Sequence, residues 1–467
     1  MRTLFLAAAF FAGGMALPAE ADQTGAKNDS ASGAWGPVPP PTDSTRAAYR
    51  TRSRSAWEYP VLVPYQIVNL PLRYSLAGFK SGVIWLDDVG FIPLVRRVFG
   101  AQELPYGVLA NFSISPLSGV GAGATFYHDE FFGPRNRAKL RTHFSTEGTR
   151  RVALGMVLNE DGKVEFEAGG GYRLRPEARF SGIGPQASDA NESHYTQETS
   201  WGGLTLSRAA SHDLSLTAGV IVSGVGTRGP RDEGSGSDDR TLLEVFGGDD
   251  RPAGYGDRSD GVMYSAGLAH DDTRKVGRPE RGGVRMFKAA YFSGFEEEDG
   301  SFYSYRADLQ QFLPLWFQER ALALRGVIHW IENDGDSDVP FQRLLTNDEP
   351  DLMRGFRDLR WRDRGITILT AEYRFPLWAY NRHNGRGIDF YMFTDVGQVF
   401  EDFDDISKRN MRASYGAGLR FMKLRGFVGR LEFGYSEEDT VWRLAAEQTF
   451  QYSKGGLYNG RDKSVLR

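Results

Sequence analysis

The chain contains no cysteine and no long apolar run beyond its first residues. With none of the 467 residues a cysteine, disulfides and thiolate metal sites are excluded. The formal net charge of −4 is too balanced to favour nucleic acid as a partner. A membrane-spanning helix needs roughly 20 successive apolar residues, so any membrane insertion of the later sequence has to use β-strands.

The first 21 residues have the features of a secretory signal peptide. Arg2 precedes an apolar run over residues 4–17, and residues 19–21 (AEA) form an A-x-A cleavage site. The run is shorter than a spanning helix, which favours cleavage over a membrane anchor. We therefore expect an exported protein.

Three other segments flank the regularly patterned part of the chain. Residues 22–56 are rich in Ser, Ala, Gly, Pro and Thr, which predicts a disordered linker. Residues 57–105 mix prolines with short apolar stretches and predict short amphipathic helices, broken at Pro93, at the rim of a barrel. Residues 453–467 form a polar C-terminal tail.

From about residue 106 to residue 452 the apolar residues recur with a period of two. Leu322 and Leu419 lie on apolar faces, whereas Arg325 and Ser414 lie on the opposite faces of the same segments. A soluble sandwich would bury such charged faces in a dry core. Lipid outside and water inside suit the pattern, and roughly 16 such segments predict an all-β, 16-stranded antiparallel transmembrane β-barrel.

The connections between these segments differ in length. Inner turns of such barrels are short and outer loops long, so residues 159–162 and 208–213 are expected inside and residues 226–259 and 332–365 outside. An exported barrel without disulfides suits the outer membrane of a Gram-negative bacterium. Its expected contacts are outer-membrane lipids and lipopolysaccharide.

One outer segment, "MRGFRDLRWRDRG" (residues 353–365), contains five arginines. The segments that follow it place Glu372 and Asp395 on their lumen faces by parity. An arginine carried inward could bind such carboxylates in a bidentate manner. Arg354 is the candidate, with Gly355 supplying a tight turn. The remaining arginines are expected in solvated loop or against lipopolysaccharide phosphate: Arg357, Arg360, Arg362 and Arg364.

The same residues resemble the bacterial surface antigen family of outer-membrane assembly and translocation barrels, the BamA/TamA-like superfamily. Met353-Arg354-Gly355-Phe356 is similar to the V-R-G-F/Y loop motif of that family. "FTDVGQVF" (393–400), which contains Gly397, is similar to its F-x-D-x-G strand motif, and residues 179–186 look like a further family element. The order and separation of the motifs also fit, over roughly residues 106–452.

The resemblance implies insertion or translocation of protein or lipid substrates at the outer membrane. It implies no cofactor, a weakly paired seam between the first and last strands, and an inward loop that stabilises the barrel. Family members usually carry POTRA modules before the barrel; residues 22–105 fit none, so a member lacking POTRA domains and served by a separate periplasmic partner is expected. The last strand resembles the family's C-terminal assembly signal, with its outward residues being Trp442, Leu444, Ala446 and Phe450.

Three other functions remain open: a passive or gated pore, an outer-membrane hydrolase such as a phospholipase, and a surface antigen without transport activity. No H-E-x-x-H or G-x-S-x-G motif is present. His143 and His329, the best acid-base candidates, have no recognisable nucleophile partner. The acidic run at 333–338 lacks the spacing of a calcium loop. We therefore expect no enzyme and no catalytic, cofactor-binding or metal residues.

Overall fold

The computed structural model describes residues 105–450, except 116, 231–239, 274–278, 316–319, 336–337, 348–352, 382–385, 424–425 and 446–448. The expected signal peptide, linker, nearly all of the rim segment and the C-terminal tail lie outside the described residues. Among the described residues, no helix is long and apolar enough to cross a membrane.

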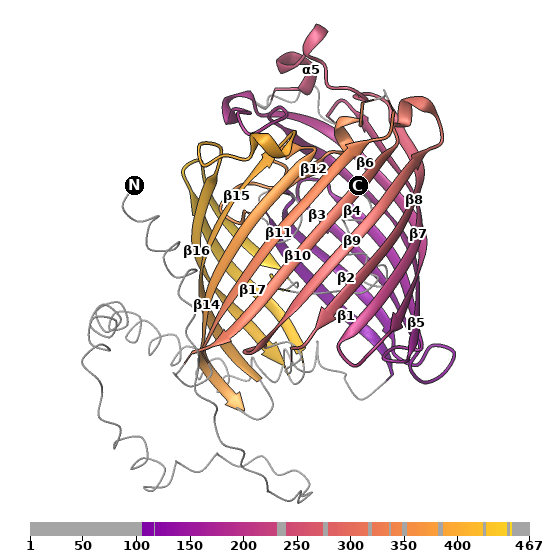
Figure 1. Ribbon diagram of the computed structural model, residues 1–467, viewed down its shortest axis with the longest axis vertical. Helices are drawn as coiled ribbons and strands as arrows, with labels where there is room; N and C mark the ends of the chain where they lie inside the picture. Colours follow the sequence, from indigo (N-terminus) through magenta and orange to yellow (C-terminus); the bar gives the residue numbers. More distant parts are fainter. Residues whose placement is uncertain are drawn as a thin grey trace, which may run out of the picture. The chain divides into compact units, whose positions relative to one another are not determined.

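The described chain forms a closed antiparallel barrel of 16 strands, which confirms the predicted fold (Figure 1). Each strand of the wall pairs with the next strand in sequence, except that β11 pairs with β14, and β1 pairs with β18 to close the barrel. The strands of the wall are β1 (Tyr106–Ser115), β2 (Gly119–His128), β3 (Arg137–Ser145), β4 (Arg150–Leu158), β5 (Val164–Phe180), β6 (Ser193–Ala209), β7 (Leu214–Arg228), β8 (Arg258–Asp271), β9 (Gly282–Gly294), β10 (Phe302–Pro314), β11 (Ala321–Asn333), β14 (Gly365–Asn381), β15 (Arg386–Phe400), β16 (Arg412–Lys423), β17 (Gly426–Ser436) and β18 (Thr440–Ala445).

Burial alternates along the strands with the predicted parity. On β11 every second residue from Ala321 to Ile331 is buried, including Arg325, and the residues between them are not. On β14 Leu369 is 63% exposed on the outer face, whereas Glu372 is 1% exposed on the inner face. The period of two therefore places the apolar face toward lipid and the charged face toward the lumen.

The long outer loops fold into a cap at one end of the barrel. They carry α5 (Leu242–Val245) and a short hairpin of β12 (Leu345–Thr346) and β13 (Arg362–Asp363). Helix α5 begins with a capping box between Thr241 and Glu244. In Figure 1 α5 lies beyond one end of the barrel wall, and β12 is at the same end.

The cap has an apolar core of its own. The Phe341 ring, 1% exposed, lies 5.3 Å from the ring of Phe180 and 5.4 Å from that of Tyr195, centroid to centroid. These residues come from the β11–β14 loop, β5 and β6, so packing of loop against wall fixes the loop inside the barrel end.

Candidate functional site

The β11–β14 loop carries Arg354 into the barrel. Met353, just before it, has a φ of 55°, a left-handed conformation that costs free energy for a residue with a side chain. Gly355 lies in the expected tight turn, which is closed by a hydrogen bond from the Phe356 N–H to the Met353 carbonyl oxygen at 3.0 Å, although the positive φ falls on Met353 and not on the glycine. A Cβ at Gly355 would lie 2.4 Å from the Ser414 Cβ and 2.7 Å from the Tyr435 carbonyl oxygen. Only glycine fits at position 355, because the loop backbone lies in direct contact with β16 and β17 of the wall.

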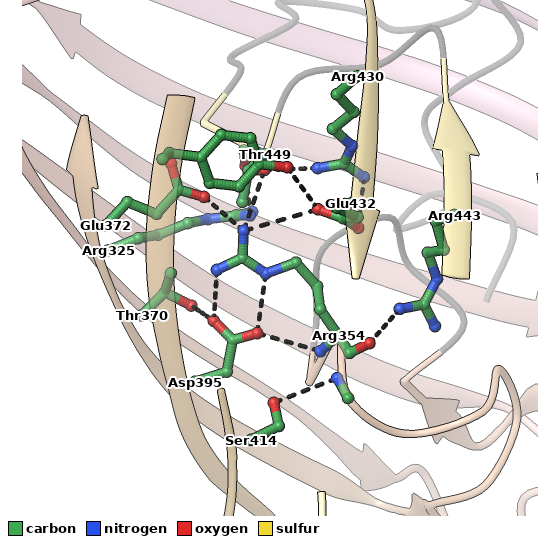
Figure 2. A network of polar contacts seen from close by, with 12 residues as sticks. Arg325, Arg354, Thr370, Glu372, Asp395, Ser414, Arg430, Glu432, Arg443 and Thr449 are labelled. Carbon is green, nitrogen blue, oxygen red and sulfur yellow. Dashed lines mark hydrogen bonds and ion pairs between the residues drawn. The ribbon is translucent and has the colours of Figure 1, made fainter. Parts of the chain in front are cut away.

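Arg354 binds two carboxylates from neighbouring strands (Figure 2). Its Nε and Nη2 donate to the two oxygens of Asp395, at 2.8 and 2.7 Å, and Nη1 donates to Glu372 Oε1. A third carboxylate, that of Glu432, has its Oε2 3.9 Å from Arg354 Nη1. The Arg354 side chain is fully buried. The pairing predicted from parity is thus present in the structure, and it joins the loop to β14 and β15.

Further side chains hold the two carboxylates in place. Thr370 Oγ1 donates to Asp395 Oδ1 at 2.9 Å, and Arg374 Nε donates to Glu372 Oε2 at 2.8 Å. The Arg354 guanidinium carbon lies 3.6 Å from the centre of the Phe393 ring, a cation–π contact. A buried charge is tolerated when it is paired and hydrogen-bonded in this way.

The backbone of the loop tip is anchored on the last strands. The Gly355 N–H donates to Ser414 Oγ at 3.2 Å. Arg443 of β18 donates to the carbonyl oxygens of Arg354 and Phe356 and to Asp358 Oδ1, the last two at 2.9 and 2.7 Å. The loop therefore connects β14 and β15 to the strand that closes the barrel.

Sequence reasoning missed most of the other members of this network. Tyr391 donates to Glu432 Oε2 at 2.8 Å. Arg443, Ser414 and Glu432 all occupy lumen-facing positions, so parity places them inside. Strand parity alone does not show which of the many lumen-facing residues contact the β11–β14 loop.

The remaining motif residues lie beside the network. Phe356 is fully buried and packs edge-on against Trp361, with ring centroids 5.7 Å apart. A Cβ at Gly397 would lie 2.6 Å from the Thr367 carbonyl oxygen of the neighbouring strand. Among the described residues, no group of three or more acidic or histidine side chains is placed to hold a metal ion.

Comparison of the sequence with known protein families gives a match that agrees with this sixteen-stranded wall and its inward, arginine-bearing loop. The sequence pattern of the Omp85 superfamily domain covers residues 111–455. The chain belongs to the Omp85 superfamily. It is accordingly an outer-membrane barrel of a Gram-negative bacterium, as expected. No curated protein sequence matches the chain.

Several solved structures are similar to this chain. BamA from Haemophilus ducreyi lacking POTRA domains 1–3 is 16% identical, with a TM-score of 0.52; the match covers 73% of this chain and 70% of that one. CdiB from Acinetobacter baumannii (13% identical, TM-score 0.44) is covered over 58% of its length and matches 72% of this chain. CdiB from Escherichia coli (15%, TM-score 0.48) is covered over 63% and matches 74%. This chain thus spans less than two thirds of either CdiB chain.

Two arginines of the β11–β14 loop that were expected at the surface are buried. Arg360 is 4% exposed and pairs with Glu438 at 2.7 Å. Arg362 is 1% exposed, and its Nη2 donates to the Tyr195 hydroxyl at 2.9 Å. They stabilise the cap. Arg364, which pairs with the exposed Glu401, fits the expected solvated position.

The last strand of the Omp85 barrel departs from the expected pattern. Trp442 faces outward and is 57% exposed, and Leu444 has the same parity. Phe450, expected outward, is instead buried against Phe312, with ring centroids 5.7 Å apart and the Arg374 guanidinium 4.4 Å from its ring centre. β18 ends at Ala445, so strand parity no longer applies at residue 450. A role for these three residues as an assembly signal stays a prediction.

The chain that follows β18 reaches the arginine network. The Thr449 carbonyl oxygen accepts from Arg325 Nη1 at 2.8 Å, and its hydroxyl accepts from Arg430 and, at 3.4 Å, from Arg354. Arg325 also binds Asp308, at 2.6 Å. Residues 449 and 450 therefore lie inside the barrel and contact the same side chains as the loop.

Both candidate histidines do have serine neighbours, which sequence reasoning missed. His143 Nε2 lies 3.2 Å from Ser113 Oγ, and His329 Nε2 lies 2.9 Å from Ser304 Oγ. Both serines lie within paired strands, where ladder hydrogen bonds use the backbone N–H groups that an oxyanion hole requires. Neither pair has the surroundings of an acyl-transfer site.

Asp363 of the cap hairpin gives the Omp85 barrel a pH-dependent stability. Burial, with the nearby carboxylates of Glu401 and Asp405, raises the pKa of Asp363 to about 6, against an ordinary value of 3.8. Well below pH 3.8 the carboxyl is protonated in both the folded and the unfolded chain. Above about pH 6 it is ionised in both, and in the folded chain that charge is buried. The cap therefore loses stability as the pH rises through this window.

We expect Asp363→Asn to stabilise the folded state by about 2 kcal/mol near pH 7.5 and not at pH 4. Asn keeps the size of the side chain and removes the buried charge. Thermal unfolding of wild type and variant at both pH values measures the difference. An equal gain at both would exclude the titration of Asp363 as its cause.

Proposed function

We propose that this Omp85 barrel inserts or translocates protein or lipid substrates at the outer membrane, and that it acts at the seam between β1 and β18. The observation that carries the proposal is the pairing along this seam. Within the described residues, the β1–β18 ladder has a single register pair, Ile114 with Leu444, whereas β1 pairs with β2 along its whole length. Along the described part of the seam, fewer ladder hydrogen bonds therefore have to break than between β1 and β2.

The course of the chain after β18 supports the same view. If the register of the Ile114–Leu444 pair continued, residues 449 and 450 would lie opposite residues 109 and 108 of β1. They lie instead inside the barrel, where Phe450 packs against Phe312 and the Thr449 carbonyl oxygen accepts from Arg325. The chain has therefore left the seam before this level. Substrate strands or lipids would cross the membrane boundary most readily there.

The filled outer end argues against a passive pore. An empty 16-stranded barrel encloses an aqueous channel, but here the β11–β14 loop packs among Phe180, Tyr195 and Tyr255. The contacts of Arg354 hold the loop inside. We propose that these contacts of Arg354, which we call the lock, keep the barrel closed while substrate passes at the seam. We also propose that the protein associates with outer-membrane lipids and a periplasmic partner.

A disulfide across the seam tests the proposal. The chain has no cysteine of its own, and opposed residues of an antiparallel pair, about 4.5–5.5 Å apart, lie within disulfide reach. In vesicles, Ile114→Cys with Leu444→Cys should lower activity at least about tenfold when oxidised and recover on reduction. Folding of an added unfolded eight-stranded barrel measures protein insertion, and loss of leaflet asymmetry of a fluorescent phospholipid measures lipid transfer.

The matched control is Ala266→Cys with Ala289→Cys, an outward pair directly opposed on β8 and β9. Its disulfide should leave both activities unchanged. Full activity of the oxidised seam variant, or vesicles no more active than empty ones in both assays, would refute the proposal.

A further inference from the structure

A small polar cavity lies among three outer loops, away from the arginine network. Its volume is about 330 Å³, near the lower limit of ligand-binding pockets. The walls come from the end of the β7–β8 loop with the start of β8 (254–259), from the turn before β10 (296–299), and from Pro340 and Gln342 of the β11–β14 loop.

Gln342 is a buried amide in this cavity without a partner. It is 2% exposed, and neither its Oε1 nor its Nε2 has a hydrogen bond among the described residues. A Cβ at Gly254, which has a φ of +79°, would lie 3.0 Å from that Oε1, so only glycine leaves room for the amide there. An unsatisfied buried amide costs about 1–3 kcal/mol, which a bound group could offset.

The charged groups of the cavity divide into engaged and available ones. Asp299 accepts hydrogen bonds from the N–H groups of Asp260 and Glu296, both at 2.9 Å, and the Glu296 carboxylate is engaged with the Asp299 N–H in a capping box. Arg258 donates to Asp260 at 2.9 Å and to Ser200 at 2.7 Å. The exposed carboxylates of Asp257 and Glu298 have no hydrogen bond or ion pair within the described ranges. The available groups are therefore two carboxylates and an amide oxygen.

We propose that this cavity binds one organic cation, through an ammonium or guanidinium group. Two carboxylates supply charge complementarity, and the Gln342 carbonyl oxygen accepts a further N–H. A cation with several N–H donors satisfies all three acceptors at once. The pocket holds a group of side-chain size.

Binding at this cavity bears on the same loop that carries Arg354. Arg343, next to Gln342, is fully buried and donates to Ser223 Oγ at 2.9 Å and to Ser259 Oγ at 3.1 Å. A cation between Glu298, Asp257 and Gln342 therefore fastens the β11–β14 loop to the outer ends of β8 and β9. A ligand that binds only the closed cap stabilises it.

Calorimetric titration of the full chain in detergent with agmatine, which has an ammonium and a guanidinium group, tests the proposal. We expect one saturable site, weakened at least about tenfold by Asp257→Asn with Glu298→Gln. The control, Asp249→Asn with Asp250→Asn, removes two exposed carboxylates from the neighbouring turn (Gly248–Asp250) and should change affinity less than about twofold.

Gln342→Leu separates a binding role from a structural one. Leucine fills the same space without the unsatisfied amide, so thermal stability without ligand should be unchanged or higher while agmatine affinity falls. Equal loss in both carboxylate pairs would show diffuse attraction only and overturn the proposal, as would unaltered affinity in Gln342→Leu.

A blocked Gly-Arg-Gly peptide as a second probe distinguishes the source of the cation. Binding of agmatine alone identifies a free small cation as ligand. Binding of both identifies a site that also admits an arginine side chain of a partner protein. Saturable binding of neither overturns the proposal.

Discussion

Arg354→Ala is expected to destabilise the barrel by about 3–5 kcal/mol, because Asp395 and Glu372 would stay buried without their cation. Both carboxylates are no more than 1% exposed, so little water can replace the guanidinium. The fraction that keeps fast, compact migration in detergent gels over a urea series measures the loss. Insertion activity in vesicles should fall in parallel.

Arg364→Ala is the matched control on the same loop. Its partner Glu401 is 68% exposed, and such surface pairs contribute about 0–1 kcal/mol. Arg362, although near in sequence, is unsuitable because it is buried and bonded to the cap. Equal stability of the two alanine variants would show that Arg354 is not a lock.

Further variants separate the charge from the geometry. Arg354→Lys should recover part of the loss, since an ammonium cannot form the bidentate contact with Asp395. Arg354→Glu with Glu372→Arg should recover little, because the new carboxylate would face Asp395 and Glu432. Asp395→Asn should harm the Arg354→Ala background less than wild type, since the orphaned charge is then removed.

The sequence predicts the wall better than the loops because a strand repeats and a loop does not. A period of two assigns Glu372 and Asp395 to the lumen whatever surrounds them. No such period extends over residues 353–364, so the burial of Arg360 and Arg362 depends on contacts with Glu438 and Tyr195, far away in sequence. Charged residues are usually exposed, and that tendency misleads inside a filled barrel.

The C-terminal end shows a second limit of the sequence pattern. Trp442 has the outward parity predicted because it lies within β18. Phe450 lies five residues beyond that strand, and the groups it contacts, the Phe312 ring and the Arg374 guanidinium, come from β10 and β14. The spacing of apolar residues does not show where a strand ends. The inward direction of Phe450 therefore could not be predicted from that spacing.

The lipid face provides a prediction graded by depth. Leu419 is the fifth residue of β16 counted from its inner end at Lys423, near the middle of a span of about 9 to 11 residues. Leu322 is the second residue of β11, beside the inner end of that strand, where we expect the membrane interface. Leu419→Arg should therefore cost about 2–4 kcal/mol, and Leu322→Arg about 0–1 kcal/mol, since an arginine near the interface can reach water.

The control for this series carries the same charge to the lumen. Thr217 lies on the inner face of β7, with Ser207 and Gly267 opposite it, so Thr217→Arg has space and polar surroundings. Its unfolding midpoint in urea, measured with the barrel in lipid vesicles, should stay near that of wild type. Equal sensitivity of Thr217 and Leu419, or a larger effect at Leu322 than at Leu419, would contradict the assignment of lipid to the apolar face and of the membrane centre to the level of Leu419.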